Sequence, residues 1–272
     1  AAFEVGRHQP ASLTDRDSAG GAICDDLDVH DRLKVLAWNL NHRINQKVIP
    51  ATVAAVLNSL CVDIALFNEF VERSRREAFR QQLSDQGYVH QLVSFSPDRH
   101  NRVLAASRVP ISPGDLKPPS MNGPAEASLL HLRVDGCDLE IIGLRVPAYT
   151  TGTKRREYRA EFNAILQGAQ HRAIVVAGDF NENPFRRNVG ATVAPFKGAE
   201  MFTATNPVGD WSYMNSLGTK TSRIDHVIHT GPVRIIDAAY CYEVNGIYLA
   251  GPKDVSPISD HAALVFTVEP LV

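Results

Sequence analysis

The apolar residues of this chain gather in short runs that are typical of buried strands. Residues 174–177 are Ile, Val, Val and Ala, and a run this short and β-branched predicts a strand buried on both faces. Gly178 and Pro184 indicate where the chain turns after it. The same pattern predicts further strands at residues 33–40, 64–67, 88–95, 102–107, 128–134, 139–146, 211–214, 223–229, 233–240 and 262–268.

Other stretches have apolar residues at the spacing of an amphipathic helix. They are residues 48–60, residues 73–86 and a segment in which Tyr158, Phe162 and Leu166 recur every four positions. About ten strands and three helices favour an α/β (α+β) fold, in which two sheets stack and the helices cover their outer faces. Irregular chain is expected at residues 110–124 and 190–209.

The composition suits one domain preceded by an arm. Of the 272 residues, 44% are hydrophobic and 21% are charged, which is ordinary for a protein with a sizeable core. Residues 1–31 are polar and become acidic toward their end, so we expect a poorly structured or peripheral arm there. Residues 32–272 are expected to form a single domain.

The net charge excludes no class of function, and the cysteine spacing excludes only a few. Lys and Arg total 28 against 30 Asp and Glu, a balance that neither requires nor forbids a polyanionic partner. The four cysteines include no C-x-x-C pair, which argues against a zinc knuckle, a redox motif or a dense disulfide framework. Cys61 lies in an apolar segment and is expected in the core.

Nothing in the sequence predicts a stable membrane association, because no run of about 18 apolar residues occurs. The chain begins without a basic and then apolar signal pattern, which favours a cytoplasmic protein and leaves a removed signal open. We expect a monomer.

Polar side chains with catalytic potential stand at the ends of the predicted strands. Strand ends and the loops beside them carry the catalytic groups of many α/β proteins. Several carboxylates and carboxamides with one His and one Arg suit a hard divalent cation and a phosphate better than an acyl-transfer triad. These residues are Asn39, Asn41, Glu69, Arg145, Asp179, Asn181, Asp225, Asp260 and His261.

Five short motifs follow one another along the chain, and their order is informative. They are Trp-Asn-Leu-Asn at residues 38–41, Asn-Glu at 68–69, Gly-Asp-Phe-Asn at 178–181, Arg-Ile-Asp-His at 223–226 and Ser-Asp-His at 259–261. Each is weak alone, but together they resemble the endonuclease/exonuclease/phosphatase superfamily, the group of DNase I, exonuclease III and the abasic-site endonucleases. The resemblance implies a four-layer sandwich of two β-sheets, mostly antiparallel, between helices. It also implies hydrolysis of a phosphate ester that depends on Mg²⁺ or Mn²⁺.

The resemblance implies a metal site built around Glu69. The Asp260 carboxylate and the Asn41 carbonyl are expected near it, and Mg²⁺ prefers such oxygen ligands. Asn39 is expected to hold either Glu69 or the attacking water in place. The family often has an acidic residue at the position of Asn41, and it usually has Gln at that of Asn68.

The remaining motif residues imply the chemistry on the phosphate. Asp179 is expected to orient and deprotonate the attacking water, and Asn181 to donate to a non-bridging phosphate oxygen. His261, kept protonated by the Asp225 carboxylate, is expected to face the charge that builds on the phosphate. Arg145 stands where related enzymes carry Tyr or His, and our hypothesis is that it contacts the phosphate or the leaving oxygen.

Basic residues near these motifs predict where a polyanion binds. Lys154, Arg155 and Arg156 crowd the start of a predicted helix, where the helix dipole disfavours cations unless an anion lies near them. A solvated helix face is the alternative for such a run. Arg102 is a further candidate for phosphate binding.

The substrate is not chosen by the motifs, since the superfamily cuts DNA, RNA, phosphoinositides and sphingomyelin with similar residues. The Arg-rich segments favour nucleic acid, and the leading hypothesis is a metal-dependent nuclease that acts on DNA. One alternative is a hydrolase of phosphoinositides, sphingomyelin or another small phosphodiester or phosphomonoester. The other is a non-catalytic member of the family that acts as a binding protein.

Overall fold

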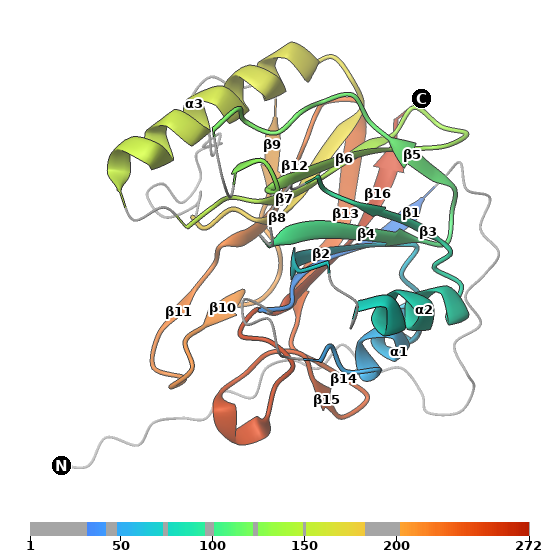
Figure 1. Cartoon of the computed structure of the whole chain (residues 1–272), viewed down its shortest axis with the longest axis vertical. Coiled ribbons are helices and arrows are strands. Elements are labelled where there is room, and N and C mark those ends of the chain that lie inside the picture. Colours follow the sequence, from blue (N-terminus) through green and yellow to red (C-terminus); the bar gives the residue numbers. More distant parts are fainter. Residues whose placement is uncertain are drawn as a thin grey trace.

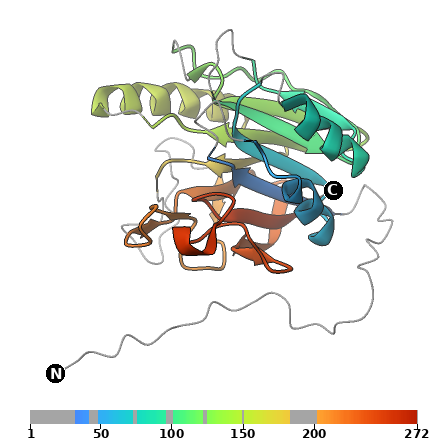
Figure 2. The same cartoon turned by 60° about the horizontal axis from the view of Figure 1, so that its bottom comes forward.

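The computed structural model describes residues 32–41, 48–72, 76–95, 101–121, 125–148, 151–182 and 202–271. Two six-stranded sheets stack in the centre of this part of the chain, and helices lie outside them (Figure 1). Helices α1 (Thr52–Ser59) and α2 (Glu77–Asp85) cover the outer face of one sheet, and α3 (Gly152–Ala169) covers the other (Figure 2). The expected four-layer sandwich is therefore confirmed.

The first sheet contains the strands that lead to the first two motifs. Its order is β13-β16-β1-β2-β4-β3, and β1 runs parallel to β2. The parallel pairing sets Asn39 beside Asn68, so both motifs emerge at one edge. The strands are β1 (Leu33–Asn39), β2 (Ile64–Phe70), β3 (His90–Val93), β4 (Arg102–Ser107), β13 (Val233–Cys241) and β16 (Ala263–Pro270).

The second sheet contains the strand of the Gly-Asp-Phe-Asn motif. Its order is β5-β6-β7-β8-β12-β9, with β7 parallel to β8 and β12 antiparallel to it. This register sets Asp179 between Arg145 on one side and Asp225 on the other. The strands are β5 (Ile111–Pro113), β6 (Leu129–Val134), β7 (Glu140–Arg145), β8 (Ile174–Asp179), β9 (Thr203–Thr205) and β12 (Asp225–His229).

Two small hairpins and a 3₁₀ turn complete the described elements. The hairpin of β10 (Tyr213–Met214) and β11 (Thr221–Ser222) lies between β9 and β12 in the chain. The second hairpin joins β14 (Glu243–Val244) to β15 (Ile247–Tyr248), and the 3₁₀ turn covers Lys253–Val255.

Apolar side chains fill each of the three spaces between the layers. Leu66, Ile141 and Val175 belong to the cluster between the two sheets. A second cluster packs α1 and α2 on the first sheet, and a third packs α3 on the second sheet through residues such as Phe162. Strands buried on both faces explain the continuous apolar runs of the sequence, since each face meets another layer.

Several expectations need correction or lie outside the described residues. Strand β2 continues past residue 67 to Phe70, because Asn68 and Glu69 remain in the buried sheet. Cys61, expected in the core, is half-buried at the turn after α1 and forms a disulfide, whereas Cys137 and Cys241 are free. Strands β5 and β9 form within the two segments expected to be irregular, because β5 pairs with β6 and β9 pairs with β12. The arm expected at residues 1–31 lies outside the described residues. No helix within the described ranges is long and apolar enough to cross a bilayer.

Candidate active site

The two sheets contribute side chains to one site at their common edge. Asn39 at the end of β1 donates from Nδ2 to Asp179 Oδ2 at the end of β8, over 3.1 Å. This bond joins residues 140 positions apart in the sequence and crosses from one sheet to the other. Both side chains are almost fully buried. The sandwich thus brings the first and third motifs into direct contact.

Asp179 is held by three hydrogen bonds from two asparagines. Besides the bond from Asn39, its carboxylate accepts from the Asn181 backbone N at 2.8 Å and from Asn181 Nδ2 at 3.2 Å. Burial raises the pKa of Asp179 to about 6, with a further contribution from the Asp225 charge, although His261, Arg145 and the Asn181 amide act against it. A carboxylate with this pKa can accept a proton near neutral pH.

The sequence around Asp179 explains this local geometry. Gly178 has φ +139°, and a Cβ there would lie 2.0 Å from the Leu144 carbonyl oxygen of β7, so only glycine fits. Asn181 has φ 50°, a left-handed conformation that asparagine tolerates better than most residues. The Gly-Asp-Phe-Asn motif therefore ends a strand and aims Asp179 at the same time.

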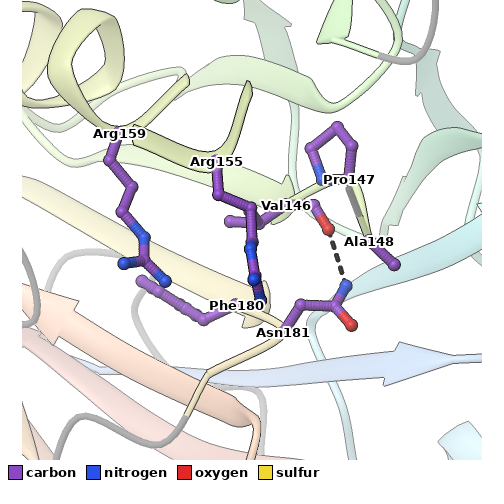
Figure 3. Close-up of a pocket in the computed structure, with 7 residues that line it drawn as sticks. All are labelled: Val146, Pro147, Ala148, Arg155, Arg159, Phe180 and Asn181. Carbon is purple, nitrogen blue, oxygen red and sulfur yellow. Dashed lines mark hydrogen bonds between the residues drawn. The ribbon is translucent and has the colours of Figure 1, made fainter. Parts of the chain in front are cut away.

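Asn181 has both of its side-chain N–H groups in use. Nδ2 donates to the Val146 carbonyl at 2.6 Å (Figure 3) and to Asp179 at 3.2 Å. The expected donation to a phosphate oxygen requires one of these bonds to be exchanged. In this conformation Asn181 ties the end of β8 to the segment after β7.

His261 and Asp225 form a buried pair. His261 Nδ1 and Asp225 Oδ2 lie 2.8 Å apart, and both side chains are nearly inaccessible to solvent. Burial alone would lower the pKa of His261, but the charge and hydrogen bond of Asp225 raise it to about 9. The imidazole is therefore a cation at neutral pH.

Two hydrogen bonds connect the Ser-Asp-His segment to the first motif. Trp38 Nε1 donates to the His261 carbonyl at 2.8 Å, and Ser259 Oγ donates to the Asn39 carbonyl at 2.6 Å. Ser212 was not predicted from the sequence, yet its Oγ accepts hydrogen bonds from the backbone N–H groups of Ile224 and Asp225. The sequence around Ser212 does not predict these hydrogen bonds, because the donors lie at the start of β12, about a dozen residues further along the chain.

Glu69 projects from a β-bulge. The pairing of β2 with β4 shifts between Phe67 and Phe70, and Glu69 has φ 60°. Bulges commonly redirect a side chain at the rim of a site. Arg145 Nε and Nη2 both donate to Glu69 Oε1, at 3.1 and 2.8 Å, and the pair is buried. Arg145, expected on the phosphate, thus lies against the expected metal ligand.

Comparison with known proteins agrees with this geometry. The model of the "Endonuclease/Exonuclease/phosphatase family" matches residues 36–261. The chain belongs to this family. Its members hydrolyse phosphate esters and depend on a divalent metal, so the chain is a hydrolase of phosphate ester bonds.

Solved structures of family members share the fold at low sequence identity. An AP endonuclease from Archaeoglobus fulgidus has 19% identity and a TM-score of 0.63 over 86% of this chain and 98% of its own. TDP2 from C. elegans has 13% identity and a TM-score of 0.63 over 88% and 75%. The 3'-5' exonuclease NExo from Neisseria meningitidis has 18% identity and a TM-score of 0.61 over 88% and 99%. No curated protein matches the sequence.

The oxygen donors at this edge fit the divalent metal that the family uses. Glu69, Asp260 and Asn41 offer only carboxylate and carbonyl oxygens, and Mg²⁺ is commonly held by one or two carboxylates. Asp225 Oδ1 is buried and has no hydrogen-bond partner among the described residues. The site therefore has one further carboxylate oxygen that can accept a hydrogen bond or contact a cation. Glu69 already accepts from Arg145, so a cation here shares that carboxylate with a guanidinium.

A second acidic cluster lies at the opposite end of β7. Asp115, His131 and Glu140 could together hold a metal ion. Arg172 already occupies the space between the carboxylates, since it donates to Glu140 Oε1 at 2.9 Å and to Asp115 Oδ1 at 2.8 Å. Glu140 begins the strand that Arg145 ends, about 17 Å away at the rise of a β-strand. We therefore interpret this cluster as an ion-pair network, separate from the active site.

Two of the four predicted phosphate-binding residues, Arg102 and Arg155, lie beside residues of the site edge. Arg102 begins β4 opposite Phe70, the residue after Glu69. Lys154, Arg155 and Arg156 are exposed on the first turns of α3, where Thr151 Oγ1 caps the Lys154 N–H. Arg155 also lines a hollow that Asn181 borders.

Breaking the Arg145–Glu69 pair should destabilise the protein. Arg145→Met leaves the Glu69 carboxylate buried without its guanidinium partner, and such a change costs about 3–5 kcal/mol in other proteins. Urea denaturation should show a lower free energy of unfolding, and Glu69→Gln in the same chain should restore most of it. If the single and the double variant lose the same free energy of unfolding, Arg145 and Glu69 do not stabilise the protein through their contact.

Proposed function

We propose that the protein is a nuclease that uses Mg²⁺ or Mn²⁺ to hydrolyse phosphodiester bonds of DNA. The observation that carries the proposal is the arrangement around Asp179. A buried carboxylate with a raised pKa is fixed by Asn39 and Asn181, next in the sheet to the Asp225 that pairs with a cationic His261. A base for water and a cation for a phosphoryl oxygen are the groups that hydrolysis of a phosphodiester needs.

The proposed reaction follows from these positions. Asp179 takes a proton from a water molecule, whose oxygen forms a bond to phosphorus while the ester P–O bond breaks. The leaving oxygen departs as an alkoxide and takes up a proton from solvent to give the hydroxyl product. Asn39 orients Asp179, and the charged His261 stabilises the negative charge that grows on the phosphate oxygens. Glu69, with Asp260 and Asn41, would hold the metal ion, which supplies further stabilisation of that charge when bound.

DNA as the substrate is supported by the charges around the site and by similar proteins. Arg102, opposite Phe70, and Arg155, in the hollow that Asn181 borders, offer positive charge near the edge where the motifs meet. Basic residues along a groove can track a nucleic-acid backbone. One similar structure is that of the 3' phosphatase NExo from Neisseria bound to a product DNA hairpin. A monomeric, cytoplasmic protein remains a prediction from the sequence.

A plasmid-nicking assay tests the proposal. Supercoiled plasmid incubated with the protein and Mg²⁺ or Mn²⁺ should be converted to the open-circular form, and EDTA should stop the conversion. The Asp179→Ala variant serves as the control for a contaminating nuclease. If plasmid and single-stranded RNA both stay intact while a small phosphodiester such as bis(p-nitrophenyl) phosphate is hydrolysed, the proposal for DNA is wrong. A phosphoinositide panel would then identify the substrate class.

A further inference from the structure

A hollow of about 180 Å³ opens beside the active site, below the first turns of α3. Its apolar wall includes Val146, Pro147 and Phe180, and the side chains of Arg155 and Arg159 reach from α3 toward Phe180 and Asn181 (Figure 3). Asn181 is shared with the active site, because its Nδ2 lies 3.2 Å from Asp179 Oδ2. The hollow therefore adjoins Asp179, the proposed base.

The size and lining of the hollow limit what fits. Pockets that hold drug-sized ligands measure roughly 300–1,000 Å³. A hollow of about 180 Å³ is smaller, so it suits the sugar and phosphate of a nucleotide but not the whole nucleotide. The apolar wall matches the carbon face of a sugar, and a guanidinium matches a phosphate through paired N–H groups.

The two arginines differ in whether the guanidinium forms an ion pair with the described part of the chain. Arg159 forms an ion pair with Glu182, the residue directly after Asn181, so its guanidinium is held by the segment that follows β8. Arg155 is exposed and has no ion pair with the part of the chain that the structure describes. The charge of Arg155 is therefore available to an anion, while Arg159 shapes the wall.

We propose that this hollow binds the sugar-phosphate unit next to the scissile phosphate, and that Arg155 holds the neighbouring phosphate. The proposal rests on the proposed nuclease function and sharpens it, since the preferred substrate is then a strand with consecutive phosphates and not an isolated diester. Phosphate contacts of this kind position a strand without reading its sequence. We therefore infer cleavage without base specificity at this subsite.

Removing a single phosphate charge from the substrate tests the subsite. An end-labelled DNA oligonucleotide carrying one uncharged methylphosphonate linkage is digested with Mg²⁺, and the products are resolved to single nucleotides. The wild type should cut the linkage on one side of the methylphosphonate about tenfold more slowly than distant linkages, the scale of one charge-assisted hydrogen bond. The slowed side reveals the direction in which the strand runs through the site.

Two arginine variants on α3 make the test specific. In Arg155→Ala all charged linkages should be cut more slowly, and the linkage beside the methylphosphonate should no longer differ from the rest. Arg156→Ala removes the same charge from the same helix outside the hollow and should keep the difference. Uniform cutting by the wild type, or a difference that persists in Arg155→Ala, overturns the subsite while the nuclease function stands. No cutting of any linkage by the wild type overturns the nuclease function itself.

Discussion

Asp179→Asn should lower kcat on DNA by a factor on the order of 10²–10³ or more, the scale of losing one group that acts in the transition state. The amide keeps the size of the carboxylate but cannot accept a proton from water. It also places an NH2 group at the position of either Oδ1 or Oδ2, and both oxygens accept hydrogen bonds from Asn39 or Asn181, so at least one of these bonds is lost. Initial rates on a labelled DNA duplex at saturating Mg²⁺ measure the effect.

The control for this variant is the same substitution far from the site. Asp138 is exposed in the turn before β7, so Asp138→Asn changes the net charge equally and should leave kcat unaltered. Circular dichroism should show that both variants are folded. Retention of more than about a tenth of the wild-type kcat by Asp179→Asn would remove Asp179 from the role of the base, because general-base catalysis contributes roughly 10²–10⁴-fold.

His261→Gln should also reduce kcat by on the order of 10²–10³, because the substitution removes the only group of the His261–Asp225 pair that is positively charged. A neutral amide donates a weaker hydrogen bond to the growing phosphate charge than an imidazolium does. The KM for DNA should change much less than kcat, since the interaction develops with the transition state. Steady-state kinetics on the same duplex separate the two constants.

Stability has to be measured beside activity for this variant. His261→Gln leaves the Asp225 carboxylate buried without its cation, so the free energy of unfolding should fall. Adding Asp225→Asn should recover stability without recovering kcat. His229→Gln, at the other end of β12, is the matched control and should keep full activity. If activity returns together with stability in the double variant, His261 only supports the fold.

Most of the fold could be predicted from local patterns. The apolar run at residues 174–177 became β8, and Tyr158, Phe162 and Leu166 became the buried face of α3. These predictions succeeded because both faces of β8 meet an apolar layer, whereas α3 buries a single apolar face against the second sheet. The prediction failed at residues 68–69, where polar side chains inside a buried strand were taken for its end. A β-bulge stabilised by the neighbouring strand is not visible in the pattern of a single segment.

The candidate site divides in the same way. Local sequence is enough to locate the polar residues at the strand ends, and their types indicate a chemistry of carboxylates, carboxamides and one His–Asp pair. Tertiary structure alone decided that Arg145 lies on Glu69, that Asn181 uses both N–H groups within the protein, and that Arg155 borders a hollow. The physical reason is distance along the chain. Arg145 and Glu69 are 76 residues apart, so only the packing of one sheet on the other decides that they meet.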